Sequence, residues 1–396
     1  MNNKKSIVIG HPIMGRGGSE AVLMWLIQSL SSEFNITLMT TRFFDLEDLN
    51  KCYGTNLNKD DFKVLIAPIP FFMRSNSKFS ALRYSFYQRF AKKVGHLYDC
   101  RISSYNLTDW GSPGIHFIGD FTWDTELSSN LNGKLAKDRP WFLRKNLARG
   151  IYLKICKVIS QGARNPISLI QSEQEIIIAN SNWASNVIYE KFSVKCHTTI
   201  YPPVEKINDI DAKDNKSIKR FVSVGRIATE KRIEDQINII KRVRSKGHNI
   251  ELHIIGSVGS DSYGLSIKSI CKDLPWVTLH GALFSKDKKI FLFESDYAIH
   301  TRLNEPFGIT VAEFIEAGCM PFVPDSGGQI EIVTPKELQF SSLDDAANKI
   351  TFVLENSELK NNLQEELAKL KNRFSTRNFC MKSYSVISDL IKDKSS

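Results

Sequence analysis

The sequence predicts an α/β protein of two domains, each built on a doubly wound, Rossmann-like parallel sheet. At 396 residues the chain is too long for one ordinary core. Short apolar segments alternate with helical patterns from end to end, which is typical of parallel α/β layers. A polar stretch without periodicity, residues 205–217, follows the rigid Tyr201-Pro202-Pro203-Val204 and is expected to link the domains. The expected domains are therefore residues 1–204 and 205–374, with a final helix, 375–396, that crosses back to the first.

The apolar segments are short enough to be buried strands rather than helices. In the first half they lie near residues 5–10, 36–40, 62–69, 100–104, 114–119, 175–181 and 197–201. In the second half they lie near residues 219–225, 250–256, 276–281, 297–302 and 320–324. The two sheets are expected to face a cleft, because open parallel sheets bind ligands beyond the carboxyl ends of their strands.

Composition excludes several classes of protein. No apolar run approaches the ~20 residues of a membrane-spanning helix. The chain begins directly with a short strand pattern, so no secretory signal is expected. The seven cysteines are scattered without a CxxC pair and read as reduced thiols of a cytoplasmic protein. No zinc spacing occurs, and the one DxD sequence, Asp209 to Asp211, falls in the linker, so no metal is expected.

The net charge of +10 is concentrated in two segments. Residues 74–93 hold six basic and no acidic side chains, and residues 134–164 hold nine basic and one acidic. Aromatic residues are interspersed with them, as in helices that bind anionic lipid at a membrane surface. Ordinary core helices with solvated lysines remain an alternative. Nucleic acid is not expected, because no recognition motif accompanies the charge.

The most informative segment follows the expected strand at 297–302. It runs from Asn304 through Glu305-Pro306-Phe307-Gly308 to Glu313, with a helical pattern that opens at Gly308. One carboxylate then lies just outside the helix and the other about two turns inside it. The first backbone N–H groups of the helix would face an anion at the positive end of its dipole. Acceptors for hydroxyls beside donors for a phosphate suit a sugar–phosphate ligand.

Three further features follow expected strands. Gly17 and Gly18 lie at the first strand–helix turn, where glycine allows backbone N–H groups to approach a phosphate. Arg226 ends a strand and Lys231 follows five residues later, so both can reach one diphosphate. His116 lies near the end of another strand and can donate to a sugar hydroxyl. Each feature alone also has a purely structural explanation.

Taken together, these elements resemble glycosyltransferase family 4, the retaining enzymes of the GT-B fold. The resemblance spans nearly the whole chain, and it is most specific in the Glu305–Glu313 block together with Arg226. The matching segments are Gly17-Gly18-Ser19-Glu20, Asn180-Ser181-Asn182-Trp183, Tyr201-Pro202-Pro203-Val204, Gly225-Arg226 with Lys231, Glu305 to Glu313, and Gly327-Gly328 with Glu331-Ile332-Val333. One departure is Arg232, which stands where a glycine often follows the lysine.

The resemblance implies a catalytic group and a substrate-binding group. Arg226 and Lys231 would hold the donor diphosphate, Glu305 the donor-sugar hydroxyls, and His116 would face the sugar. Glu313 would bind the ribose hydroxyls. The remaining substrate contacts would come from the backbone of Gly17, Gly18, Phe307, Gly308 and Ile309.

The implied function is metal-independent, retaining transfer of a sugar from a GDP- or UDP-linked donor to a saccharide. The residues at the His116-Phe117 strand end and from Glu305 to Thr310 resemble those of mannosyltransferases in the family, which favours mannose. No cofactor besides the nucleotide-sugar substrate is expected. The acceptor is expected to be polyprenyl-linked, in O-antigen-like or capsule-like glycan assembly at the inner face of the plasma membrane. A transferase or synthase acting on a soluble acceptor, and a catalytically silent GT-B scaffold, are the alternatives.

Overall fold

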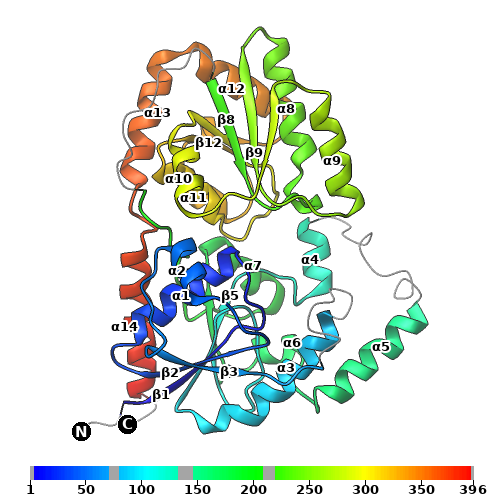
Figure 1. The fold of residues 1–396 in the computed structure, drawn as a ribbon, viewed down its shortest axis with the longest axis vertical. Helices are drawn as coiled ribbons and strands as arrows, with labels where there is room; N and C mark the ends of the chain where they lie inside the picture. The colour runs from blue at the N-terminus through cyan, green and yellow to red at the C-terminus, as the bar shows by residue number, and fades with distance from the viewer. Residues whose placement is uncertain (1–3, 71–79, 133–145, 208–218, 394–396) are drawn as a thin grey trace. The chain divides into compact units, whose positions relative to one another are not determined.

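The computed structural model describes residues 4–70, 80–132, 146–207 and 219–393. By its internal contacts the chain divides into two units (Figure 1). The N-terminal unit comprises Met1–Pro203 together with Arg377–Ser396, and the C-terminal unit comprises Val204–Thr376. Most of the expected linker lies outside the described residues.

The N-terminal unit is a seven-stranded, wholly parallel sheet in the order β3-β2-β1-β4-β5-β6-β7. The order reverses direction between β1 and β4, which marks a doubly wound sheet. Its strands are β1 (Ser6–Gly10), β2 (Asn35–Thr40), β3 (Phe62–Ile66), β4 (Cys100–Ser103), β5 (Ile115–Ile118), β6 (Ile176–Ala179) and β7 (Thr198–Thr199). Its helices are α1 (Gly18–Leu30), α2 (Leu46–Tyr53), α3 (Ser80–Val94), α4 (Thr125–Asn132), α5 (Asn146–Ile159), α6 (Pro166–Ile170), α7 (Asn182–Phe192) and α14 (Thr376–Asp393).

Alternation along β1 shows how this sheet is covered on both faces. Ile7 and Ile9 point into one core with α1, whereas Val8 points into another with α3, as the two-residue period of a strand requires. The first core also receives Phe379, Ile387 and other apolar residues of α14. The last helix of the chain therefore packs on the N-terminal unit.

The C-terminal unit is a six-stranded parallel sheet in the order β10-β9-β8-β11-β12-β13. Its strands are β8 (Lys219–Val224), β9 (Ile250–Ile255), β10 (Val277–Gly281), β11 (Tyr297–Ile299), β12 (Met320–Pro324) and β13 (Gln339–Phe340). Its α-helices are α8 (Ile233–Ser245), α9 (Ser262–Lys272), α10 (Ser285–Phe293), α11 (Ile309–Glu316), α12 (Leu343–Glu355) and α13 (Ser357–Leu370). Short 3-10 turns cover Gly95–Leu97, Thr229–Lys231, Gly328–Glu331 and Lys336–Leu338.

The predicted α/β fold of two doubly wound parallel sheets is confirmed. Two details differ from the sequence prediction. The edge strand β13 was missed, because two residues are too few to show an alternating pattern. Helix α11 begins at Ile309, so Glu313 lies about one turn into the helix rather than two. Within the described residues, no helix is both long and apolar enough to cross a membrane.

Candidate active site

A buried carboxylate, that of Glu305, organises the loop between β11 and α11. Its Oε2 atom lies 2.8 Å from the Lys231 ammonium and 3.3 Å from Nε2 of His300. Its Oε1 atom accepts a hydrogen bond of 3.0 Å from Nη1 of Arg302. Both oxygens of one carboxylate are thus bound by side chains from the carboxyl-end loops of β8 and β11, the edge at which parallel sheets bind ligands.

This environment sets the ionisation of the carboxylate. Burial alone would raise the pKa of Glu305, but the charges of Lys231 and Arg302 outweigh burial and hold that pKa well below its ordinary value. Burial lowers the pKa of His300, although its contact with Glu305 opposes the shift. A neutral His300 contacts a carboxylate as an N–H donor, so its proton belongs on Nε2.

Backbone geometry fixes the position of Glu305. Asn304 adopts a left-handed φ of 50° and Gly327 a φ of 80°. A Cβ atom at Gly327 would lie 2.6 Å from the backbone N and O atoms of Glu305, so only glycine fits this approach. Gly328 N–H then donates to the Glu305 carbonyl at 2.7 Å. The Gly327-Gly328 pair is therefore a support for the Glu305 loop.

Lys231 is held by the same loop. It ends the 3-10 turn Thr229–Lys231, and the Thr301 hydroxyl donates to its carbonyl at 2.8 Å. The next residue, Arg232, adopts a left-handed φ of 51°. A left-handed φ favours glycine, which explains why a glycine is common in the family at the position that Arg232 takes here. The Arg232 side chain bonds to Asp235 in the first turn of α8.

The other predicted residues of the C-terminal unit lie nearby in the chain but have separate partners. The Arg226 side chain is 72% exposed and pairs with Glu230 at 3.0 Å. Glu313, on α11, pairs with Lys288 of α10 at 2.7 Å. The structure thus brings Lys231 and Glu305 into direct contact, while Arg226 and Glu313 each contact a neighbouring side chain of opposite charge.

The start of α11 provides backbone donors. Gly308 is its N-cap with a φ of 104°, and its carbonyl accepts from the N–H groups of Val311 and Ala312. The N–H groups of Ile309 and Thr310 precede the first of these bonds and point outward at the positive end of the helix. The Phe307 side chain is buried against Phe374, at 5.2 Å between ring centroids. Phe307 thus anchors the segment that presents Gly308 and Ile309.

In the glycine loop of the N-terminal unit, backbone N–H groups donate hydrogen bonds to a nearby glutamate side chain, that of Glu20. The buried Glu20 carboxylate accepts from Gly15 N–H at 2.8 Å and from Gly17 N–H at 3.1 Å. Burial would raise the pKa of Glu20, but its contacts with His11 and Ser19 lower it. The expected phosphate contact by the Gly17 N–H is therefore not met in this conformation. Gly18, the first residue of α1, stays a prediction.

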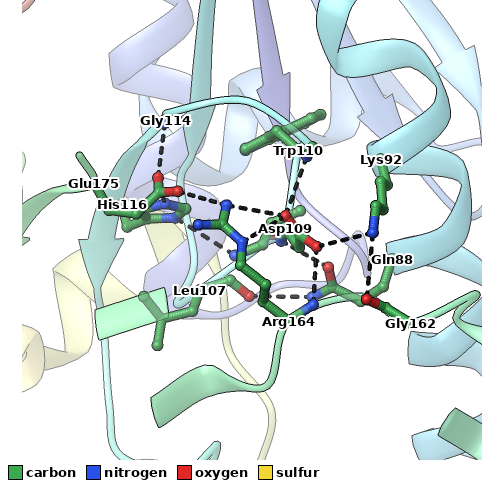
Figure 2. A network of polar contacts seen from close by, with 12 residues as sticks. Gln88, Lys92, Leu107, Asp109, Trp110, Gly114, His116, Gly162, Arg164 and Glu175 are labelled. Atoms are coloured by element: carbon green, nitrogen blue, oxygen red, sulfur yellow. Dashed lines mark hydrogen bonds and ion pairs between the residues drawn. The ribbon is translucent and has the colours of Figure 1, made fainter. Parts of the chain in front are cut away.

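His116 does not lie where the sequence prediction placed it. Its side chain is 0% exposed, and Nε2 contacts the buried Glu175 carboxylate at 2.9 Å (Figure 2). His116 is the second of four residues in β5, whereas Gly119 and Asp120 follow the carboxyl end of the strand. The expectation that His116 faces a sugar is therefore wrong, because the apolar and glycine pattern located the strand but not the direction of this side chain.

Instead, His116 belongs to an internal network at the amino ends of β5 and β6. Figure 2 shows the Arg164 guanidinium between two carboxylates, at 3.0 Å from Asp109 and 2.7 Å from Glu175. Burial would raise the pKa of each carboxyl, but hydrogen bonds and the Arg164 charge lower the pKa of Asp109. The pKa of Glu175 is lowered mainly by its contact with His116, with further hydrogen bonds from Gly114 N–H and Arg164. Lys92 approaches Asp109 at 3.9 Å. The network ties the segment between α5 and α6 to the sheet.

Sequence reasoning missed His300, Arg302 and Lys288. His300 and Arg302 lie within five residues of Glu305, so the density of polar residues directly after a buried strand was an available signal. Lys288 had no such signal, since its contact with Glu313 depends on the packing of α10 against α11. Within the described residues, no group of three or more histidine, cysteine or acidic side chains is arranged to hold a metal ion. The linker pair Asp209 and Asp211 lies outside them.

Comparison with known proteins confirms the predicted family resemblance. Residues 205–370 match the family described as glycosyl transferases group 1. Curated relatives named GDP-Man:Man(3)GlcNAc(2)-PP-Dol alpha-1,2-mannosyltransferase include the Homo sapiens protein, 27% identical over 57% of this chain and 50% of its own length. The Mus musculus protein is 29% identical over 44% of this chain and 39% of its own length. The chain thus spans half or less of the length of these relatives.

Solved structures with this fold cover nearly the whole chain. WaaG, a glycosyltransferase involved in lipopolysaccharide biosynthesis, superposes with a TM-score of 0.69 at 13% identity over 96% of this chain and 99% of its own. Anabaena HepE in complex with UDP-glucose gives 0.66 at 14% identity over 97% and 100%. At such low identity these likenesses establish the GT-B fold alone.

The Figure 2 network gives a prediction on stability. Replacing Arg164 with Met should lower the free energy of unfolding by about 2 kcal/mol, because Asp109 and Glu175 would stay buried without their shared cation. Breaking a fully buried pair costs roughly 3–5 kcal/mol, and the effect is smaller here because the Arg164 side chain is 34% exposed. Chemical denaturation at pH 7 measures it. Arg242→Met, which breaks the exposed pair with Asp344, is the control, with an expected loss below about 1 kcal/mol.

The pH dependence has a definite sign. Because the pKa values of Asp109 and Glu175 are depressed, their stabilisation is present above the unfolded-state values and is lost as pH falls through the folded-state values. Without Arg164 the folded-state values rise, so the variant should begin acid unfolding at a higher pH than wild type. Superimposable acid-unfolding curves would contradict this account.

Proposed function

Because residues 205–370 match the group 1 glycosyltransferases and the whole chain has the GT-B fold, we propose that this protein is a retaining glycosyltransferase that uses a nucleotide-sugar donor. The observation that carries the proposal is the ionised, buried Glu305 carboxylate held beside Lys231. A carboxylate accepts hydroxyl groups of a sugar, and an ammonium binds a phosphate. Their contact places both recognition groups in one loop cluster beyond the strands.

The roles follow from charge and position. Lys231 and the exposed Arg226 neutralise the departing diphosphate. The N–H groups of Gly308, Ile309 and Thr310 add donors at the positive end of α11. Glu305 accepts donor-sugar hydroxyls, and Glu313 accepts the ribose hydroxyls after exchanging its contact with Lys288.

In the proposed reaction, the bond between the sugar C1 atom and the diphosphate oxygen breaks, and a bond forms from C1 to an acceptor hydroxyl on the same face. The acceptor proton passes to the leaving diphosphate oxygen, and no protein nucleophile takes part. The protein's contribution is then to position the donor and to stabilise the negative charge that develops on the diphosphate.

For the donor we propose GDP-mannose, with UDP-sugars as the alternative, and for the acceptor a polyprenyl-linked saccharide. The names of the curated relatives, which include a GDP-linked mannose donor and a dolichol-linked acceptor, support this choice. The proposed setting is surface-glycan assembly, of the O-antigen or capsule type, at the cytoplasmic face of the membrane. A soluble acceptor remains the second candidate. A silent scaffold is disfavoured, because Arg226, Lys231, Glu305 and Glu313 are all present.

Replacing Lys231 or Arg226 with Ala should lower transfer by on the order of 100-fold, the usual effect of removing one donor that stabilises developing charge. Transfer from radiolabelled GDP-mannose and UDP-glucose to membrane-extracted lipid acceptors measures this. Transfer within threefold of wild type in both alanine variants would remove the diphosphate assignment.

The two glutamates should differ in their effects. Glu313→Gln should weaken the binding of GDP or UDP measured by calorimetry, whereas Glu305→Gln should lower turnover alone.

Transfer should persist in EDTA, because Lys231, Arg226 and the start of α11 supply the positive charge that a divalent cation supplies in other transferases. The assay is repeated with excess EDTA and then with added Mg²⁺ or Mn²⁺. Loss of most activity in EDTA, with recovery on adding either ion, would contradict a metal-independent reaction.

We also propose that α5 docks on an anionic membrane. Its side formed by Tyr152, Cys156 and Ile159 packs toward α3. The adjoining side exposes Ile151, Ile155 and Val158, at helical spacing, with Lys154 and Lys157 beside them. Exposed apolar residues flanked by lysines suit the interface of an anionic bilayer.

Two basic residues of the segments 74–93 and 134–164 are not part of the membrane-binding surface that the charge pattern predicted. Arg83 is buried in α3, where burial lowers its pKa, and Arg164 turns inward to the Figure 2 network. The contribution of residues 74–79 and 134–145 lies outside the described residues. Lys154 and Lys157 are therefore better targets for a membrane test than Arg83.

The protein should cosediment with phosphatidylglycerol vesicles and be released by salt, since each basic residue near an anionic surface contributes about 1 kcal/mol before screening. Lys154→Glu/Lys157→Glu and Ile155→Ser/Val158→Ser should each weaken binding. The matched control is Lys268→Glu/Lys272→Glu on the exposed side of α9, which should bind like wild type. Two outcomes would mean that α5 is merely solvated: both α5 variants bind phosphatidylglycerol vesicles as well as the α9 control does, or the wild-type protein binds neutral vesicles as well as anionic ones.

A further inference from the structure

We propose that Arg302 is a positioning residue of the donor site, which holds the Glu305 carboxylate in place when Lys231 turns to the donor diphosphate. The proposal rests on the proposed function, and it assigns a role to a side chain outside the matched motif residues. Arg302 acts through Glu305 and is not itself placed on the sugar.

The geometry divides the two oxygens of Glu305 between two cations. Lys231 contacts Oε2 at 2.8 Å, and Arg302 contacts Oε1 at 3.0 Å. Lys231 reaches Glu305 from a different segment, the turn after β8, 74 positions earlier in the sequence, whereas Arg302 belongs to the same loop as Glu305. A flexible lysine can exchange one anion for another, but an arginine three residues away is fixed to the carboxylate by the loop itself.

The loop is braced so that Arg302 keeps this position. The Gln329 amide donates to the Arg302 carbonyl at 3.0 Å and to the Ser326 carbonyl at 2.9 Å. Thr301, the preceding residue, is tied through its hydroxyl to the Lys231 and Arg232 carbonyls. The backbone at Arg302 is thus held by two contacts, one through the hydroxyl of the preceding Thr301 and one at its own carbonyl.

Charge counting gives the reason for a second cation. In the structure Lys231 and Arg302 share one carboxylate, and His300 is neutral, so the cluster carries one net positive charge. When a diphosphate takes Lys231, Glu305 would keep only the neutral His300 if Arg302 were absent. A buried carboxylate without a cation is costly and tends to take up a proton. Arg302 therefore keeps Glu305 ionised as a hydroxyl acceptor in the donor complex.

A purely structural role accounts poorly for an arginine here. Its Nε atom is buried and lacks a hydrogen-bond partner within the described part of the chain. An unsatisfied buried donor destabilises the fold, which a methionine of similar length would avoid. The benefit of arginine thus lies in the charge that it brings to Glu305.

The experiment compares Arg302→Met and Arg302→Lys with wild type, with Arg242→Met as an exposed-arginine control. Affinities for GDP and UDP are measured first by calorimetry. Hydrolysis of GDP-mannose and UDP-glucose, with water as acceptor, then gives kcat and KM from about pH 3 to about pH 8, a range that includes the lowered pKa of Glu305. Thermal unfolding at each pH reports folding.

Arg302→Met should lower kcat about tenfold through misplacement of Glu305, with little change in GDP or UDP affinity. The acid limb of kcat should move upward by about one pH unit, because loss of a neighbouring cation raises the pKa of Glu305. Arg302→Lys should restore the acid limb, and Arg242→Met should match wild type throughout. A merely structural role would lower activity equally at every pH and would not be rescued by lysine.

If wild type hydrolyses a donor and Arg302→Met keeps its kcat and its acid limb, the Arg302 proposal alone is overturned. The same holds if Arg302→Lys behaves like Arg302→Met. If wild type binds neither nucleotide and hydrolyses neither donor, the proposed function itself is contradicted, and the role of Arg302 falls with it.

Discussion

The candidate site depends on keeping one carboxylate charged inside the protein. Removing a carboxylate from water favours its neutral form, so Glu305 needs positive partners at hydrogen-bond distance to remain ionised. Lys231 and Arg302 provide the charge, His300 provides a neutral donor, and Gly327 lets the backbone close on the loop. The loop conformation, the glycine pair and the turn after β8 can each be understood as conditions for that contact.

The same constraint acts in the N-terminal unit with a different outcome. Asp109 and Glu175 are buried and kept ionised by Arg164, but they lie toward the amino ends of the strands. Ligands of open parallel sheets bind beyond the carboxyl ends. Buried, charge-paired carboxylates with lowered pKa values are therefore not sufficient to identify a binding site. The two clusters are distinguished by the strand ends at which they lie: the stabilising network lies toward the amino ends, and the candidate active site lies at the carboxyl ends.

The sequence predicted the features that depend on local patterns. The apolar runs located all but the two-residue strand β13, and Gly308 marked the start of α11. Side-chain direction was less accessible. His116 sits in a strand that was correctly located, yet its ring points to Glu175, which lies 59 residues further along the chain. Gly17 has the backbone freedom to bind a phosphate, but its N–H contacts Glu20 three residues later.

The contacts of Glu305 show why such partners escape sequence analysis. Arg302 and Glu305 are three residues apart in a loop, where no periodicity fixes which side chains meet. Their contact requires the left-handed turn at Asn304 and the support of Gly327 and Gly328, more than 20 residues away. Each condition is visible in the sequence as a separate residue, but their combination exists only in the folded loop. The ionisation of the carboxylate is thus a property of tertiary structure, even though the glutamate itself is recognisable from its motif.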